Sequence, residues 1–217
     1  MNWPILSSLS EEDRRRVLAS TRRRKFGRRE VLFHEGDPGD TLHLIDKGRV
    51  AVRITTPLGD VATLRVLGVG EVVGEMAVIK ENGRRGATVL ALEPTETLSL
   101  QRDQFLELRR EHPAVDRFLI EVLVANLAVA DNHLMEALFV PVERRVLRRL
   151  LALTDVYGGS GNRGEIPLTQ DDLASLAGTS RATVNRVLRQ AEESGWVALG
   201  RGKVKVLDAE RLARRAR

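Results

Sequence analysis

Residues 168–190, LTQDDLASLAGTSRATVNRVLRQ, constrain the fold more than any other part of the chain. Thr169, followed three residues later by Asp172, forms a capping box that starts a short helix. Gly178 stands where that helix must end in a tight turn, and Ser180 is placed to cap a second helix. The sequence therefore predicts a helix, a tight turn and another helix.

The second of these helices is amphipathic and has a polar outer face. Its buried stripe consists of Val184, Val187 and Leu188. Its outer face runs from Arg181 to Arg186, and small Ala174 and Gly178 let the two helices cross closely. Helix pairs of this geometry place their second helix in the major groove of DNA. An ordinary helical hairpin is the alternative, and the spacing of small and apolar residues favours the DNA-binding motif.

The charge distribution supports this interpretation independently. The whole chain of 217 residues has a formal net charge of +5, but residues 143–217 hold 15 Lys/Arg against 9 Asp/Glu. Residues 1–142 hold the other 20 basic residues against 21 acidic ones. A basic C-terminal part behind a nearly neutral N-terminal part indicates a nucleic-acid module joined to a unit with another task.

Several classes of protein are not expected. The chain has no cysteine, which excludes disulfides, cysteine-ligated iron–sulfur clusters and thiol redox sensing. Its four histidines lack metal-ligand spacing. No nucleophile–base set or phosphate-binding P-loop is present, so we expect no enzyme and no metal site. No apolar run approaches about 18 residues, so we expect a cytoplasmic protein with no membrane partner.

The N-terminal half is rich in β-type segments. Short runs of β-forming residues, punctuated by glycines, extend from about Lys25 to Gln101; they are VLFHEG, TLHLIDKG, RVAVRITT, VATLRVLG and TETLSLQ. Such runs fit a compact antiparallel roll or barrel. Short helices are expected on either side, at residues 11–20 and 102–110.

A small-residue motif lies inside this β-rich region. Gly74 and Glu75 open a short helical turn, and Arg85 follows ten residues after Glu75. Free backbone N–H groups and one arginine make a pocket for a single phosphate, and Glu75 is able to accept bonds from sugar hydroxyls. Taken alone, the same residues also fit a buried Glu–Arg ion pair in a turn.

The order of these features resembles the CRP/FNR family of bacterial transcription regulators, the cyclic-AMP receptor proteins. The resemblance covers roughly residues 10–207 and includes the motif G-E-M-A…R-G-A at Gly74–Ala87. It implies an α+β fold with a jelly-roll-like cyclic-nucleotide-binding domain (residues 1–112), a dimerisation helix (113–138) and a winged helix-turn-helix domain (139–217). It also implies a homodimer that binds a pseudo-palindromic operator and contacts RNA polymerase.

The resemblance assigns residues to two sites. The expected ligand-binding residues are Gly74, Glu75, Met76, Arg85, Gly86, Ala87, Ala130 and Asp131. The expected DNA-binding residues are Thr169, Ser180, Arg181, Ala182, Thr183, Asn185, Arg186, Arg201 and Lys203. The last two lie in an expected β-hairpin wing at residues 195–207. The basic ending ERLARRAR fits either a short helix or a frayed tail.

The long central helix also carries a pattern of its own. Seven residues alternate four and three apart and form an expected dimer seam, namely Val115, Leu119, Val122, Asn126, Val129, His133 and Glu136. Four others are expected to pack on the roll, namely Phe118, Leu123, Leu127 and Leu134. A hinge at residues 139–141 follows, and a monomeric core helix is the alternative.

Departures from the family pattern bear on the effector. Gly86 stands where cyclic-AMP-responsive members of the family often have a hydroxyl residue after the motif's arginine. Ala130 and Asp131 stand at the positions where cyclic-AMP receptors have the Thr and Ser that contact adenine. We expect cyclic AMP as the allosteric effector, ahead of cyclic GMP, with no cofactor. Asp131 is a candidate for a residue that helps to choose the base, and a solvated helix carboxylate is the alternative for it. The alternative is a regulator of the same fold that senses another effector or none.

Overall fold

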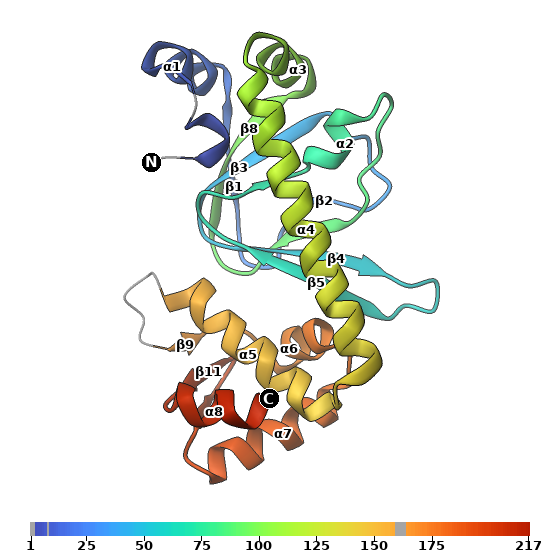
Figure 1. The fold of residues 1–217 in the computed structure, drawn as a ribbon, viewed down its shortest axis with the longest axis vertical. Coiled ribbons are helices and arrows are strands. Elements are labelled where there is room, and N and C mark those ends of the chain that lie inside the picture. The colour runs from blue at the N-terminus through green and yellow to red at the C-terminus, as the bar shows by residue number, and fades with distance from the viewer. Residues whose placement is uncertain (1–2, 8, 159–163) are drawn as a thin grey trace. The chain divides into compact units, whose positions relative to one another are not determined.

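The computed structural model of the protein describes residues 3–7, 9–158 and 164–217 (Figure 1). The chain divides into two compact units. One unit comprises residues 1–54 and 65–129, and the other comprises residues 55–64 and 130–217. No helix in the described part of the chain is long and apolar enough to span a bilayer.

The N-terminal part of the chain forms two β-sheets. After a short 3-10 helix (Pro4–Leu6) and α1 (Glu11–Ser20), the strands are β1 (Arg22–Phe26), β2 (Val31–Phe33), β3 (Thr41–Lys47), β4 (Val50–Thr55), β5 (Val61–Leu67), β6 (Val72–Val73), β7 (Thr88–Ala91) and β8 (Thr95–Gln101). One four-stranded sheet has the order β1-β8-β3-β6 and the other the order β2-β7-β4-β5. β3 runs antiparallel to both of its neighbours. The predicted β-rich roll is therefore confirmed.

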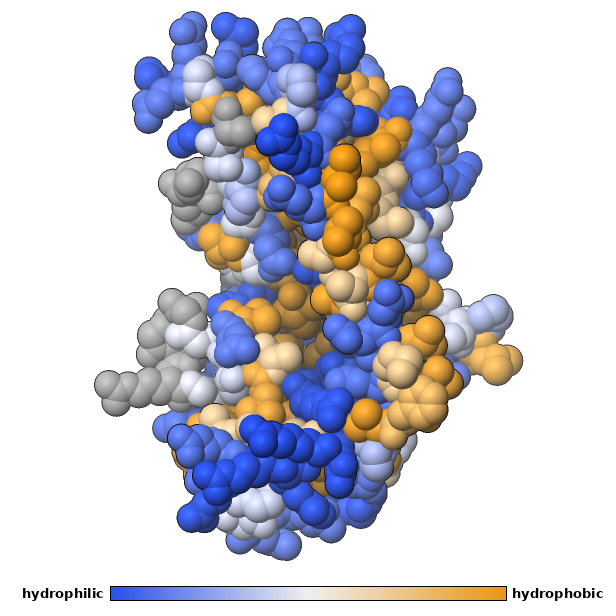
Figure 2. Space-filling view, viewed as in Figure 1, coloured by the Kyte–Doolittle hydropathy of each residue, from blue (hydrophilic) through white to orange (hydrophobic). Residues whose placement is uncertain are grey.

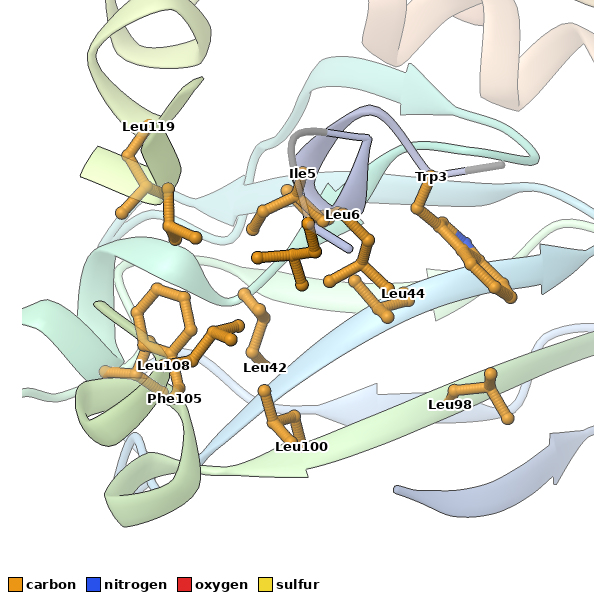
Figure 3. Packing of buried hydrophobic residues seen from close by; sticks show 14 residues of the cluster. Trp3, Ile5, Leu6, Leu42, Leu44, Leu98, Leu100, Phe105, Leu108 and Leu119 are labelled. Atoms are coloured by element: carbon orange, nitrogen blue, oxygen red, sulfur yellow. The ribbon is translucent and has the colours of Figure 1, made fainter. Parts of the chain in front are cut away.

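A hydrophobic core joins one sheet of the roll to the helices around it. Figure 3 shows side chains from the N-terminal segment, β3, β8 and the surrounding helices meeting in this core, among them Trp3, Leu44, Phe105 and Leu119. Trp3 also donates a hydrogen bond of 3.1 Å from its indole Nε1 to the carbonyl oxygen of Ile45. The indole N–H is thereby satisfied inside the core, as buried tryptophans require.

Three helices complete this part of the chain. They are α2 (Glu75–Ile79), α3 (Arg102–Glu111) and the long α4 (Pro113–Phe139). The helices predicted for residues 11–20, 102–110 and 113–138 are all present, with ends within one residue of the expected ones. α4 ends at Phe139, the first residue of the predicted hinge at residues 139–141, and the next helix begins at Val142.

The structure contradicts the predicted roles of the two faces of α4 in part. All seven residues of the expected dimer seam (115, 119, 122, 126, 129, 133 and 136) are buried or half-buried within the single chain. Val115 and Leu119 belong to the core of the roll, and Glu136 accepts a hydrogen bond from Arg148. Of the residues expected on the roll, Phe118 does pack against this core, whereas Leu123, Leu127 and Leu134 are exposed.

The apolar face of α4 that stays exposed is a second, interleaved stripe. We call it the α4 stripe; it consists of Ile120, Leu123, Val124, Leu127, Leu134, Met135 and Leu138, which are 37–63 % exposed. Figure 2 shows these hydrophobic side chains gathered along the helix. Five of these residues, 120, 124, 127, 134 and 138, together with Asp131, alternate four and three apart, which is heptad spacing.

The C-terminal part of the chain is a winged helix-turn-helix. Its elements are α5 (Val142–Gly158), β9 (Glu165–Ile166), α6 (Gln170–Ala177), α7 (Arg181–Glu193), β10 (Val197–Gly200), β11 (Lys203–Val206) and α8 (Ala209–Ala216). The capping box of Thr169 and Asp172 is formed, Gly178 has φ +60°, and Ser180 caps α7 by accepting from the Thr183 N–H at 3.2 Å. The predicted helix, turn and helix are confirmed, and so is the hairpin wing.

The basic C-terminal segment, whose form the sequence leaves open, is a helix. In α8 Leu212 is fully buried, and the Nε of Arg148 in α5 donates to the Ala216 carbonyl oxygen at 2.8 Å. That bond satisfies one of the carbonyl groups that a helix end leaves without a partner. The end of the chain is therefore a packed part of this unit.

A buried arginine pocket and a nucleic-acid interface

Gly74 fixes the start of the predicted phosphate-binding turn. It precedes α2 with φ +94°, a left-handed conformation that favours glycine. A Cβ atom here would lie 2.5 Å from Nη1 of Arg85 and 3.0 Å from the Thr41 carbonyl oxygen. Only glycine lets the guanidinium of Arg85 approach the N-terminal end of α2 this closely.

Arg85 is held inside the roll, and one of its three guanidinium nitrogens has no hydrogen-bond partner in the described part of the chain. Its side chain is 2 % exposed, and its guanidinium carbon lies 4.1 Å from the centre of the Phe33 ring. Nη2 donates to Thr41 Oγ1 at 2.8 Å, and Nη1 donates to the Gly74 carbonyl oxygen at 3.3 Å. Nε is buried and has no hydrogen-bond partner in the described part of the chain. The burial of a donor without a partner is costly, so this atom is suited to an anionic ligand.

Glu75 lies beside this arginine without pairing with it. It is 8 % exposed, and burial raises the pKa of its carboxyl group. Among the residues that the structure describes, Glu75 and Arg85 form neither an ion pair nor a hydrogen bond with each other. The alternative interpretation, a buried Glu–Arg ion pair, is therefore not what the chain forms, and both groups keep bonding capacity.

The other expected ligand residues differ in exposure. Met76 and Gly86 are exposed and Ala87 is half-buried. Ala130 and Asp131 are exposed on α4. The structure thus brings Arg85 next to Gly74, which directly precedes Glu75. Ala130 and Asp131 lie on the face of α4 that carries the α4 stripe.

The sequence did not indicate three residues that position Arg85, namely Phe33, Thr41 and His43. His43 is buried, its Nδ1 lies 3.1 Å from Thr97 Oγ1, and its Nε2 lies 3.4 Å from the same Thr41 hydroxyl that Arg85 contacts. These residues are 42 to 52 positions before Arg85 in the chain. No local pattern indicated that they would meet.

Acid should destabilise the protein through His43. Burial, and secondly the charge of Arg85, lower the pKa of His43 from 6.5 to about 4. As the pH falls below about 6.5, His43 becomes protonated in the unfolded chain but stays neutral in the folded chain. The free energy of unfolding therefore decreases between about pH 6.5 and pH 4. This pKa difference corresponds to about 3 kcal/mol.

Urea unfolding of the wild type and of His43→Gln across this pH range measures that contribution. The two proteins carry the same carboxylates, so the difference between the two stability curves isolates His43. We expect the wild type to lose more stability than the variant as the pH falls. Parallel curves would show that His43 does not carry the effect.

The second site is an exposed basic face of the C-terminal unit. Arg181 and Arg186 of α7 have side chains that are 69 % and 52 % exposed, and Ala182 and Asn185 are exposed beside them. A groove joins α6, α7 and the wing; it is lined by Thr169, Gln170, Asp171, Arg181, Asn185, Gly200, Gly202 and Lys203, among others. Four of the expected DNA-binding residues, Thr169, Arg181, Asn185 and Lys203, therefore line one groove.

Each of three basic residues on this face has an acidic partner that the sequence analysis did not identify. Arg181 lies 3.5 Å from Asp171, and Lys203 lies 3.1 Å from Glu165. Arg186 donates to Glu143 at 2.8 Å. Ser180 and Thr183 lie at the start of α7, and Arg201 lies exposed at the tip of the wing, where a DNA backbone is reachable.

Family models match both halves of the chain. Residues 23–112 match the family described as "Cyclic nucleotide-binding domain", and residues 144–215 match the "Crp-like helix-turn-helix domain". Among curated relatives, the chain is 33 % identical over 195 residues to the CRP-like cAMP-activated global transcriptional regulator of Mycobacterium tuberculosis, covering 88 % of this chain and 87 % of that one. It is 38 % identical over 209 residues to the cyclic AMP receptor protein of Thermus thermophilus, covering 95 % and 93 %.

Solved structures show the same architecture. The catabolite activator protein of Thermus thermophilus aligns with a TM-score of 0.56 at 36 % identity, covering 98 % of each chain. The c-di-GMP responsive global regulator of Xanthomonas campestris aligns with a TM-score of 0.78 at 24 % identity, covering 91 % of this chain and 99 % of that one. At that identity the second likeness supports the fold alone.

Proposed function

Because the chain belongs to the CRP/FNR family of transcription regulators, and is therefore a DNA-binding regulator and not an enzyme, we propose that a cyclic nucleotide, cyclic AMP first, controls its binding to operator DNA. The observation that carries this proposal is the guanidinium of Arg85, which is almost fully buried, fixed by Thr41 and Gly74, and left with an unpartnered Nε. Such a group fits a cyclic phosphate, and Glu75 fits the ribose hydroxyls.

Calorimetric titration with cyclic AMP and with cyclic GMP tests this assignment. We expect binding of cyclic AMP in the micromolar to millimolar range and weaker binding of cyclic GMP. An absence of heat for both nucleotides at millimolar concentration would rule out the nucleotide site.

The second candidate is a regulator of the same fold that does not depend on a cyclic nucleotide. Two observations favour it. Gly86 stands next to Arg85 at a position where family members often have a hydroxyl residue. Ala130 and Asp131 stand at the positions where cyclic-AMP receptors have the Thr and Ser that contact adenine. An unchanged operator affinity in the presence of bound nucleotide would favour this candidate.

Serine at position 86 should strengthen nucleotide binding. A Cβ atom on Gly86 would meet no heavy atom within 4 Å, and its backbone is not left-handed, so the site accepts a side chain without strain. A hydroxyl next to Arg85 adds one phosphate hydrogen bond, worth about 0.5–1.5 kcal/mol, or roughly a two- to tenfold gain in affinity for cyclic AMP. Gly86→Ala is the matched control, because it changes the backbone without adding a donor; equal affinities of the two variants would contradict the prediction.

We further propose that the protein is a C2 homodimer held by the α4 stripe, and that RNA polymerase is a further partner in the bacterial cytoplasm. The stripe has heptad spacing, and large apolar residues on it are exposed in the single chain. Asp131 lies within the same spacing, so a ligand contact by Asp131 would be made at the dimer interface. A dimer places its two recognition helices about one turn of DNA apart, which fits a pseudo-palindromic operator.

The operator preference should be relaxed at one base pair in each half-site. Arg181 and Arg186 resemble the family's guanine-reading arginines, but Ala182 stands where a glutamate usually accepts from cytosine. A methyl group accepts no hydrogen bond, so we expect the cytosine preference to be absent and thymine to be tolerated. The Ala182→Glu variant should restore the preference for cytosine at this base pair, with a difference in binding free energy of about 1–3 kcal/mol.

Binding selection over randomised half-sites, with the wild type and Ala182→Glu side by side, measures this preference. The guanines read by the two arginines should stay strict in both proteins and serve as the internal control. A strong cytosine preference in the wild type at that base pair would show that α7 docks in another register.

A further inference from the structure

A carboxylate from a distant helix holds one of the two recognition arginines. Nη2 of Arg186 in α7 donates to Oε1 of Glu143 at 2.8 Å, and Glu143 lies in the first turn of α5, 43 positions earlier in the chain. The other recognition arginine, Arg181, is held less closely, at 3.5 Å from Asp171. The two arginines therefore enter a DNA groove with different degrees of restraint.

The surroundings of Glu143 keep its carboxylate charged and in place. The hydrogen bond from Arg186 is the largest of the effects that hold the pKa of Glu143 below its ordinary value, and the charge of Arg215 in α8 acts in the same direction. Glu143 also lies at a helix N-terminus, where the exposed N–H groups favour a negative charge. The carboxylate thus lies between Arg186 and the packed C-terminal helix.

The geometry of a guanidinium lets Arg186 bind Glu143 and a base together. The group has two donor edges, one formed by Nη1 and Nη2 and the other by Nε and Nη2, and both edges share Nη2. Because Nη2 carries two hydrogens that point to different edges, one bond to Glu143 leaves a complete edge free. A complete edge is what a bidentate contact with O6 and N7 of guanine requires.

We propose that Glu143 is a positioning residue that orients Arg186 for guanine and thereby sets base discrimination. This inference rests on the proposed reading of DNA by α7. In the free protein the Arg186–Glu143 pair is about half exposed and contributes little to the stability of the fold. When DNA covers it, water is removed and the bond strengthens, so its effect falls on specificity and not on folding.

The opposite role makes a different prediction. If Glu143 only competed with DNA for Arg186, removing its charge would strengthen binding to the guanine site at least as much as to other sites. A positioning role predicts that removing the charge raises affinity for all DNA slightly, since one negative charge is lost, while discrimination for guanine falls.

The experiment compares Glu143→Gln with Glu210→Gln, which removes the same charge from an exposed residue of α8. The affinity of each dimer is measured for two operators that differ only by guanine or adenine at the Arg186 position. We expect Glu143→Gln to lower the preference for guanine about three- to tenfold and Glu210→Gln to leave it unchanged. Equal preference in the two variants, or a raised preference in Glu143→Gln, overturns the proposal.

A double-mutant cycle with Arg186→Ala shows whether Glu143 acts through this arginine. In the Arg186→Ala background, Glu143→Gln should have no further effect on the preference for guanine. A loss of preference of the same size in that background also overturns the proposal. Failure of the wild type to prefer guanine at all would instead overturn the proposed reading of DNA, so the two failures are distinguishable.

Discussion

Replacing Leu127 with lysine should convert the dimer into a monomer of 24.2 kDa. Leu127 lies in the middle of the α4 stripe and is 62 % exposed in the single chain, so the substitution leaves the fold of the chain intact. In a C2 dimer each substitution occurs twice at the same interface. Two uncompensated charges buried there cost several kcal/mol each.

Sedimentation at micromolar concentration measures this change. Leu58→Lys is the matched control, because Leu58 is 92 % exposed in the turn between β4 and β5 and lies outside the stripe. The control should remain a dimer. If Leu127→Lys sedimented as a dimer as well, the α4 stripe would not be the interface.

The same variant should lose operator affinity by about a hundredfold or more. A dimer engages its second half-site at a high effective concentration, an advantage that a monomer lacks. Binding to a single half-site should change much less, because Leu127 lies on α4 and not among the DNA-facing residues of α7. An equal loss for whole and half operators would indicate a misfolded variant, which a thermal unfolding curve would reveal.

Replacing Arg85 with glutamine should weaken cyclic AMP binding by tenfold or more. A hydrogen bond to a charged group contributes about 1.5–3 kcal/mol, and glutamine keeps a donor for Thr41 while losing the charge. The neighbouring Arg84 is exposed and its Nη1 donates to the Gly36 carbonyl oxygen at 2.9 Å, so Arg84→Gln removes the same charge beside the pocket.

Isothermal titration of both variants compares the two arginines directly. Arg84→Gln should bind cyclic AMP nearly as well as the wild type, and Arg85→Lys, which keeps the charge, should fall between the wild type and Arg85→Gln. Thermal unfolding identifies any variant that is misfolded. Equal affinities of Arg84→Gln and Arg85→Gln would remove Arg85 from the phosphate site.

The helix-turn-helix could be predicted from the sequence because its signals are local. Thr169, Gly178 and Ser180 determine where helices begin and end through bonds to residues a few positions away. The strands of the roll with apolar alternation were found for the same reason. β1, Arg22–Phe26, was missed because four of its five residues are exposed and basic, as suits an edge strand that pairs only with β8.

The faces of α4 could not be assigned from the sequence. Two apolar stripes, one through Leu119 and one through Leu127, both show spacings of three and four residues. Only packing decides between them: Leu119 packs in the core of the roll, whereas Leu127 is 62 % exposed in the single chain. Periodicity reports that a face is buried, and it does not report whether the chain itself or a partner buries it.

The candidate sites were predictable in part. The residues of the Gly74–Ala87 motif are adjacent in the chain, so their chemistry is visible in the sequence. Their supporting contacts are not, because Thr41 and Phe33 reach Arg85 through the pairing of distant strands. The same holds for Glu143, which meets Arg186 only after α5 and α7 have packed.

Control of DNA binding by a bound nucleotide can be tested directly with one titration. Fluorescence anisotropy of a labelled operator duplex should be measured with the wild-type dimer at increasing concentrations of cyclic AMP and, in parallel, of cyclic GMP. We predict that saturating cyclic AMP raises operator affinity by about tenfold or more, within the usual range of allosteric coupling, and that cyclic GMP has a smaller effect. An operator affinity that stays constant up to millimolar nucleotide, with the dimer intact, would contradict the account.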